Sequence, residues 1–76
     1  MARAKNSEFY IRFGEFVRKA REDKGLTQTD MANACGLTQS FYSKVERGDR
    51  EVSFENALRI CVELNLNMKD FIREYL

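Results

Sequence analysis

Three hydroxyl residues, Thr27, Thr38 and Ser53, each lie directly before a segment with a helical pattern. A hydroxyl in that position accepts a hydrogen bond from a backbone N–H group of the first helical turn. The N–H groups that remain free at a helix start attract anions such as phosphate. Arg47 and Arg50 flank these segments and can add positive charge. The residues that we expect to contact phosphate groups are Thr27, Gln28, Thr38, Ser53, Arg47 and Arg50.

Residues 26–48 have the spacing of two short helices joined by a tight turn. Gly36 lies between the two helical patterns, where a residue without Cβ can adopt a positive φ. Ala32 is small enough for the helix after Gly36 to cross close over the helix before it. Tyr42 and Val45, three residues apart, form the inward face of the helix after Gly36. This is the spacing of a helix-turn-helix, a motif that places its second helix in the major groove of DNA.

The fold class predicted by the whole chain is all-α, because no segment shows the alternation of a strand. The predicted helices are 8–24, 28–35, 39–47, 54–64 and 68–76. Ser7 is a candidate cap of the first helix, and Thr27 with Asp30 has the spacing of a capping box. Asn65 can close the fourth helix in a left-handed conformation, and Asn67 can cap the last.

Apolar residues recur at helical spacing and predict the helix faces that form the core. The first helix carries Phe9, Phe13, Phe16, Val17 and Ala20. The fourth carries Phe54, Ala57, Leu58, Cys61 and Leu64, and the last carries Met68, Phe71, Ile72, Tyr75 and Leu76.

The composition predicts one small folded domain over residues 1–76, with residues 1–6 expected to be flexible. No apolar run approaches the ~20 residues of a membrane span, and the basic start has no apolar run behind it, so a soluble cytoplasmic protein is expected. The net charge is only +1, but residues 1–24 hold seven basic and four acidic residues, whereas residues 51–76 hold three and five. One face can therefore bind phosphate, although the weak net charge predicts modest non-specific binding.

The two cysteines, Cys35 and Cys61, lie in apolar helical patterns and are expected to be buried free thiols rather than a disulfide. The chain has no histidine to join them, so they make no metal site. The missing histidine also removes the commonest general base. We therefore expect no metal, no cofactor and no enzymatic activity.

Several separated features, in this order and spacing, resemble the Cro/cI-like (XRE-type) family of helix-turn-helix DNA-binding domains. They are Arg21, residues 25–28, Met31 and Ala32, residues 36–40, residues 44–48, and Leu58, Cys61 and Leu64. The resemblance spans residues 13–72 and implies a compact five-helix bundle like the DNA-binding domain of lambda repressor.

The resemblance also implies an interior salt bridge between the first and third helices, formed by Arg21 and Glu46. An Arg fork can give a carboxylate two parallel hydrogen bonds and would fix the third helix against the first. The alternative is a pair of solvated surface charges.

Base reading is implied for Gln39, Ser40 and Lys44, which match positions that face base edges in the family. Gln can pair with adenine and Lys with guanine. Ser43 lies nearer the DNA backbone, and Phe41 either contacts a thymine methyl or sugar or packs on the scaffold. The alternative for this face is an ordinary polar helix surface exposed to solvent.

Three departures from the family pattern concern packing. The first helix is unusually aromatic, so that Phe9, Tyr10 and Phe16 need cover from the last helix or from a partner. Val52 replaces a common proline, and Tyr42 is larger than the usual aliphatic residue, so its hydroxyl needs a partner.

The resulting interpretation is a sequence-specific transcriptional regulator, like the phage-type repressors, restriction–modification controllers and antitoxin-type autoregulators among the small members of the family. We expect a homodimer on a near-palindromic operator of double-stranded DNA, because a monomer reads only one short half-site. The candidate interface is the aromatic first helix or a set on the last helix: Met68, Phe71, Ile72, Tyr75 and Leu76. Core packing within one subunit is the alternative for most of that set.

The competing interpretation is a protein-interaction module or antitoxin, in which the same bundle binds a partner such as a toxin or an RNA polymerase subunit. The surface of the third helix distinguishes the two interpretations, because only the DNA-binding one needs it.

Overall fold

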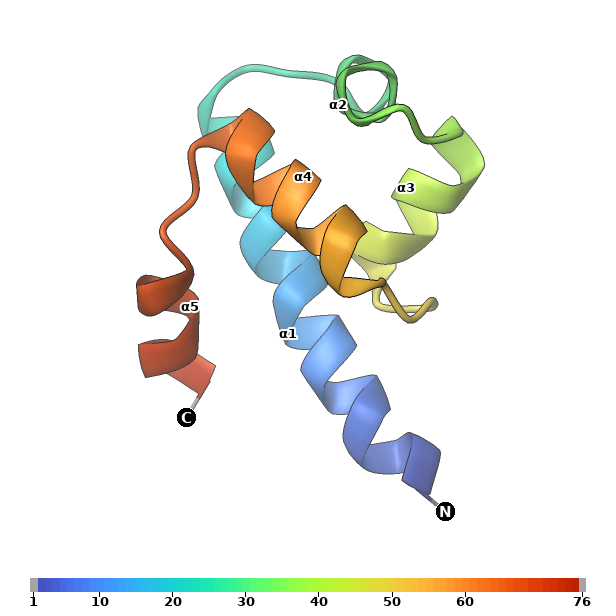
Figure 1. Ribbon diagram of the computed structural model, residues 1–76, viewed down its shortest axis with the longest axis vertical. Helices are drawn as coiled ribbons and strands as arrows, with labels where there is room; N and C mark the ends of the chain where they lie inside the picture. The colour runs from blue at the N-terminus through green and yellow to red at the C-terminus, as the bar shows by residue number, and fades with distance from the viewer. Residues whose placement is uncertain (1, 76) are drawn as a thin grey trace.

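The longest helix, α1 (Ala2–Asp23), makes its main contacts with three other helices in the computed structural model. The structure describes the backbone of residues 2–75 and the side chains of residues 8–75. The neighbours of α1 are α3 (Gln39–Arg47), α4 (Phe54–Leu64) and α5 (Met68–Tyr75), while α2 (Gln28–Cys35) contacts α3 and α4. Figure 1 shows α5 on one side of α1, with α2 and α3 on the other. The described backbone contains five helices and no strand, which confirms the predicted all-α bundle.

The helix bounds agree with the predicted ones except at the two ends of α1, and the predicted end of α5, Leu76, lies outside the described residues. Helix α1 begins at Ala2 rather than at residue 8, so Ser7 lies inside the helix and the prediction that it caps α1 was wrong. Residues 2–7 contain no glycine or proline, and alanine, arginine and lysine among them favour helix. The expected flexibility of residues 1–6 stays a prediction, because Met1 and the side chains up to Ser7 lie outside the described residues, as does Leu76.

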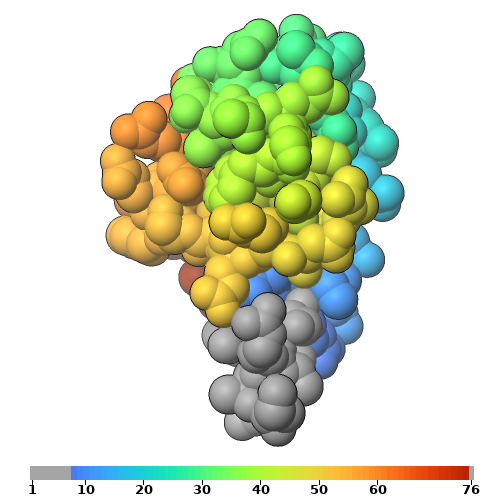
Figure 2. All heavy atoms as spheres, turned by 90° about the vertical axis from the view of Figure 1, so that its right-hand side faces the viewer, coloured from blue at the N-terminus to red at the C-terminus, as the bar shows by residue number. Residues whose placement is uncertain are grey.

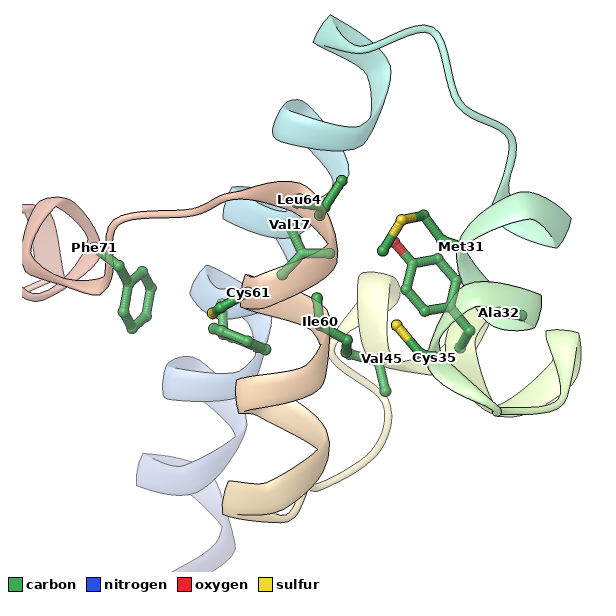
Figure 3. Packing of buried hydrophobic residues seen from close by; sticks show 11 residues of the cluster. Val17, Met31, Ala32, Cys35, Val45, Ile60, Cys61, Leu64 and Phe71 are labelled. Atoms are coloured by element: carbon green, nitrogen blue, oxygen red, sulfur yellow. The ribbon is translucent and has the colours of Figure 1, made fainter.

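One apolar core lies between α1 and the shorter helices. Figure 3 shows Ile60 of α4 directed toward Val45 of α3, with Cys35 and Met31 of α2 close by and Phe71 entering from α5. The buried members of this core are Phe13, Val17, Met31, Ala32, Cys35, Tyr42, Val45, Ile60, Cys61, Leu64 and Phe71. Cys35 and Cys61 are both free and buried, as predicted.

The aromatic residues of α1 are covered by α5. The ring of Phe71 lies 5.6 Å from those of Phe9 and Phe13 and 5.3 Å from that of Phe16, measured between centroids. Tyr75 adds an edge contact with Phe9 at 5.2 Å. Such aromatic pairs contribute about 0.5–1.5 kcal/mol each beyond the area they bury. The predicted cover by the last helix is therefore confirmed for Phe9 and Phe16.

The core-facing side of α4 differs from the predicted one. Phe54 is 78% exposed and Leu58 is 44% exposed, whereas Ile60, which the predicted face omitted, is fully buried. The face that packs inward consists of Ala57, Ile60, Cys61 and Leu64, which have the spacing i, i+3, i+4, i+7 of one helix face. Phe54 and Leu58 instead lie, with Val62, along a second line of α4 that faces solvent. We call these three residues the outer α4 stripe.

Candidate nucleic-acid interface

Capping residues fix the start of α2 and both ends of the turn between α2 and α3. Thr27 Oγ1 accepts a hydrogen bond from the N–H of Asp30, and Asp30 Oδ2 accepts one from the N–H of Thr27, each at 3.0 Å. These bonds form the predicted capping box, and the backbone hydrogen bond from Thr27 lowers the pKa of Asp30. Gly36 ends α2 at φ 69°, and Thr38 then caps α3 by accepting from the N–H of Phe41. The sequence thus fixes where α3 begins.

Arg21 and Glu46 join α1 to α3 through two hydrogen bonds. Arg21 Nε lies 2.6 Å from Glu46 Oε2, and Arg21 Nη2 lies 3.1 Å from Glu46 Oε1. Glu46 is 5% exposed, so the predicted interior salt bridge is observed and the surface-charge alternative does not hold. Gln28 donates a third bond to this carboxylate, from Nε2 to Oε1 at 3.0 Å, and Arg21 Nη1 donates to the carbonyl of Leu26 at 2.8 Å. These bonds hold α3, the start of α2 and the end of α1 together around the Arg21 guanidinium and the Glu46 carboxylate.

The pKa of the Glu46 carboxyl reflects two opposing effects. Burial alone would raise the pKa, but hydrogen bonds, led by those of Arg21, outweigh burial and lower it below its ordinary value. The same bond raises the pKa of Arg21. Both groups are therefore charged at neutral pH, as a structural ion pair requires.

Tyr42 packs directly behind this ion pair. Its side chain is fully buried, and burial, followed by the nearby Glu46 carboxylate, raises the pKa of its phenol. Its Oη is the one buried side-chain polar atom of the described residues that lacks a partner with hydrogen-bond geometry. The hydroxyl thus has the Glu46 carboxylate as a neighbour, but no full hydrogen bond.

Two glycines allow α3 to lie close against α1. A Cβ on Gly14 would collide with the backbone carbonyl oxygens of Val45 and Glu46, and a Cβ on Gly48 would come within 2.5 Å of the Cα of Ile11. Gly14 was not among the residues predicted to matter for packing, although a glycine inside an otherwise helical pattern is a known sign of close packing. The backbone of α1 thus directly supports the C-terminal turn of α3.

The side chains predicted to read bases lie on an open face of α3. Gln39 and Ser40 are exposed, and Lys44 and Ser43, one helical turn further along, are partly buried. Figure 2 shows α3, in yellow-green, at the surface of this face with no other segment across it. The residues predicted to contact phosphate at the helix starts, Thr27, Thr38 and Ser53, are exposed as well. Ser53 Oγ accepts from the N–H of Asn56, which confirms it as the cap of α4.

Arg47, the last residue of α3, and Arg50, three residues beyond it, are both held by neighbouring side chains on the surface. Arg47 donates from Nε to Asp49 Oδ2 at 3.0 Å and from Nη1 to Ser43 Oγ at 3.1 Å. The guanidinium of Arg50 lies over the ring of Phe41, 5.1 Å from its centroid, in a cation–π arrangement. Phe41 is partly buried and packs against the core. These contacts orient both cations at the edge of the α3 face.

The candidate dimer residues of α5 lie in different environments. Phe71 is 3% exposed and belongs to the core of the subunit, and Tyr75 is partly buried against Phe9. The Sδ atom of Met68 lies 3.4 Å from Cys61 Sγ, so Met68 also packs within the subunit. Ile72 is the exposed apolar member, at 47%, and Leu76 lies outside the described residues.

Two further observations bear on the kind of site. Within residues 8–75, no three His, Cys, Asp or Glu side chains come together as metal ligands would. None of the helices in the described part of the chain has the length and apolar character to cross a membrane.

The capped turn, the buried ion pair behind α3 and the open polar face of α3 define a helix-turn-helix DNA-binding domain. The chain belongs to the Helix-turn-helix family, of the Cro/cI-like (XRE) type, and the family matches residues 17–71.

Similar proteins of known kind include two control proteins and a solved controller. Control protein C.MunI of Mycoplasma sp is 30% identical over 69 residues, which cover 90% of this chain and 93% of that protein. Control protein C.BamHI of Bacillus amyloliquefaciens is 36% identical over 61 residues, which cover 79% of this chain and 75% of that protein. The restriction-modification controller protein C.AhdI of Aeromonas hydrophila superposes with a TM-score of 0.77 at 34% identity, over 84% of this chain and 97% of that one. The family and these relatives are regulators and not enzymes, which supports a DNA-binding regulator.

Proposed function

We propose that this protein is a sequence-specific transcriptional regulator that reads a near-palindromic operator as a homodimer. The observation that carries the proposal is the seating of α3: its inner side is fixed by the Arg21–Glu46 ion pair, while its outer side is uncovered. A helix that is to enter the major groove needs both properties, a fixed orientation and a free face. Its action is by occupancy, in which the bound protein blocks or recruits RNA polymerase at a promoter. A protein acting on DNA in this way works in the cytoplasm.

Within this proposal, Gln39, Ser40 and Lys44 read base edges. A Gln amide pairs with adenine N6 and N7, and a Lys ammonium donates to guanine O6 and N7. Gln39 and Ser40 lie in the first turn of α3, where side chains of a recognition helix reach deepest into the groove. Each well-formed pair discriminates against a wrong base by about 1–3 kcal/mol.

Phosphate contacts position the protein around this helix. The exposed helix starts at Thr27, Thr38 and Ser53 present free backbone N–H groups, with Ser43, Arg47 and Arg50 at the edge of the same face. Gln28 is placed differently, because its amide nitrogen already donates to Glu46. Its part in phosphate binding would therefore be through the backbone N–H at the start of α2, with its side chain bracing the ion pair.

The homodimer follows from the size of the site. One α3 helix covers a few base pairs, and two copies reading half-sites about 34 Å apart supply the affinity and specificity that a regulator needs. A two-fold symmetric dimer reads a sequence with matching symmetry.

Selection of bound fragments from a random DNA pool tests this function. A symmetric motif with half-sites one helical turn apart is the expected result. The triple variant Gln39→Ala, Ser40→Ala, Lys44→Ala should lose the motif, and Lys69→Ala, which removes a lysine on α5, is its matched control. Enrichment of no motif by the wild-type protein, or an unchanged motif in the triple variant, would reject α3 as the reading element. Binding to a partner protein that survives the triple variant would favour the protein-interaction module.

A further inference from the structure

The guanidinium of Arg50 lies over the ring of Phe41, with 5.1 Å between the guanidinium carbon and the ring centroid. Arg50 is exposed in the segment that joins α3 to α4, whereas Phe41 is a partly buried residue of α3 that packs against the core. Phe54, the first residue of the outer α4 stripe, is closer to Arg50 in the chain, but its ring is 78% exposed. Arg50 is therefore held by the anchored ring of α3.

The ring of Phe41 has a fixed place on α3. The backbone N–H of Phe41 donates to Thr38 Oγ1 at 3.1 Å, so the residue lies in the capped first turn of the helix. Gln39 and Ser40 directly precede it in the same turn. The contact with Phe41 therefore fixes the Arg50 guanidinium relative to the residues proposed to read bases. Figure 2 shows the segment after α3, in yellow, on the same face of the molecule as α3.

The two arginines at this edge are held in chemically different ways. Arg47 Nε donates to Asp49 Oδ2 at 3.0 Å, so a carboxylate offsets part of its charge. The ring of Phe41 attracts the Arg50 cation through its π face and carries no opposite charge. None of the hydrogen bonds and ion pairs among the described side chains uses Arg50. Its N–H donors thus remain available to an anion.

We propose that Phe41 is a positioning residue, whose ring holds Arg50 in the free protein at the place from which Arg50 binds a DNA phosphate. This inference rests on the proposed function and gives Phe41 a part in it that needs no contact between the ring and DNA. The planar guanidinium presents parallel N–H groups, which suit two oxygens of one phosphate.

Holding the arginine before DNA arrives lowers the cost of binding. An unrestrained arginine has many rotamers, and a phosphate that binds it must restrict them. The ordering of one such side chain on association weakens affinity by roughly two- to tenfold. A guanidinium that already lies over Phe41 avoids part of this loss.

Replacing the ring and replacing the charge should affect DNA binding differently. Phe41→Leu keeps an apolar side chain against the core but removes the π face, so the Kd for the operator duplex selected from the random pool should rise roughly two- to tenfold. Arg50 keeps its charge in that variant, so the slope of log K against log salt should not change. Arg50→Ala should raise the Kd and also reduce that slope by up to ~0.9, the value for one neutralised phosphate.

A double-mutant cycle shows whether Phe41 acts through Arg50. If it does, Phe41→Leu should weaken binding little further in an Arg50→Ala background, and Phe41→Tyr, which keeps a ring, should bind like the wild-type protein. Phe16→Leu is the matched control, because it removes a partly buried ring on α1 and should leave the Kd unchanged. Thermal unfolding checks that every variant is folded at the assay temperature. Additive effects of Phe41→Leu and Arg50→Ala, or an equal loss in Phe16→Leu, overturn the proposal.

The contact can also be observed without DNA. Side-chain protons of an arginine above an aromatic ring are shifted upfield in the NMR spectrum by the ring current. The Arg50 protons should show this shift in the wild-type protein and in Phe41→Tyr, and should lose it in Phe41→Leu. Unshifted Arg50 protons in the wild-type protein overturn the proposal whatever the DNA measurements give.

The outcomes separate this inference from the proposed function. DNA binding that needs the Phe41 ring only while Arg50 is present supports both. Selection of no DNA motif by the wild-type protein rejects the regulator and the positioning role with it, even if the ring-current shift is present. A selected motif together with additive effects of the two substitutions leaves the regulator standing and rejects the role of Phe41 alone.

Discussion

Arg21 of α1 and Glu46 of α3 share two hydrogen bonds, although they lie 25 positions apart in the chain. Gln28 at the start of α2 donates to the same carboxylate, and Tyr42 lies fully buried close by. The position of α3 therefore depends on one ion pair, which side chains of α2 and α3 also contact. Such a pair fixes geometry more than it adds net stability, since desolvation offsets most of its attraction.

Removing one partner of this pair should be strongly destabilising. Glu46→Gln leaves the Arg21 guanidinium, whose side chain is 12% exposed, without its counter-charge. We expect a loss of about 3 kcal/mol in the free energy of unfolding, at the lower end of the range for broken buried pairs because Arg21 keeps the Leu26 carbonyl. Urea unfolding at pH 7 measures it. Glu22→Gln is the control: Glu22 lies 3.9 Å from Arg21 with its side chain 60% exposed, so that change should cost below about 1 kcal/mol. Equal losses of unfolding free energy in the two variants would contradict a buried ion pair between Arg21 and Glu46.

Stability should also fall in acid, and Glu46 should account for part of the fall. Its pKa is lowered in the folded protein, so the unfolded chain takes up protons first as the pH decreases. The stabilisation is present above the ordinary Glu pKa of about 4.3 and is lost as the pH falls through the lower folded value. Asp30, with a pKa lowered by Thr27, acts in the same direction. Urea midpoints measured from pH 7 to pH 3 should fall less steeply in Glu46→Gln than in the wild-type protein. Parallel curves would show that Glu46 does not titrate with folding.

Gly14→Ala should destabilise the protein even though alanine is the better helix former. The intrinsic gain is about 1 kcal/mol, but the new Cβ would collide with backbone carbonyl oxygens of α3, which cannot move like a side-chain tip. Overpacking of this kind costs about 1–3 kcal/mol, so the net effect should be a loss accompanied by displacement of α3. Gly25→Ala provides a comparison, because Gly25 has φ 71° and nothing within 4 Å of its Cβ position. Its cost should be backbone strain alone, about 1–2 kcal/mol, with α3 undisturbed. A stabilised Gly14→Ala variant would show that the two helices are not in close contact there.

Except at the start of α1, local signals predicted the helices and their caps well, because the information lies within a few residues. The Thr27–Asp30 capping box and the left-handed Gly36 are examples. The Arg21–Glu46 pair is a contact between distant residues, and it came from the family resemblance rather than from periodicity.

Features that depend on the exact fit of two helices were missed. Gly14 gives no local sign of which helix crosses it, and the bond from Gln28 to Glu46 depends on how α2 lies against α3. On α4, apolar residues cover so wide an arc that two faces were possible, and only packing against α1 and α2 selects the one with Ile60. The base-reading residues stay predictions until DNA binding is measured.

Tyr42→Phe should leave stability unchanged or raise it slightly. The hydroxyl is buried without a hydrogen-bond partner, so its removal relieves a desolvation penalty while the ring keeps its packing. The expected change is between zero and about +1 kcal/mol in the free energy of unfolding. Thermal and urea unfolding measure it, with Tyr10→Phe on the partly buried surface of α1 as the control. A loss above about 1 kcal/mol would mean that the hydroxyl does bond the Glu46 carboxylate.

Asp49→Asn should tighten DNA binding if the proposed function is correct. Asp49 accepts a hydrogen bond from Arg47 at the edge of the α3 face, and both side chains are more than half exposed, so the pair adds little to stability. A DNA phosphate must compete with this carboxylate for Arg47. Its removal should therefore lower the Kd several-fold at moderate salt and steepen the slope of log K against log salt by up to ~0.9, the value for one more neutralised phosphate. Asp70→Asn makes the same charge change on α5, away from this face, and should alter the Kd much less. If the two variants bind DNA equally well, Arg47 does not contact the backbone, and net charge alone explains the gain.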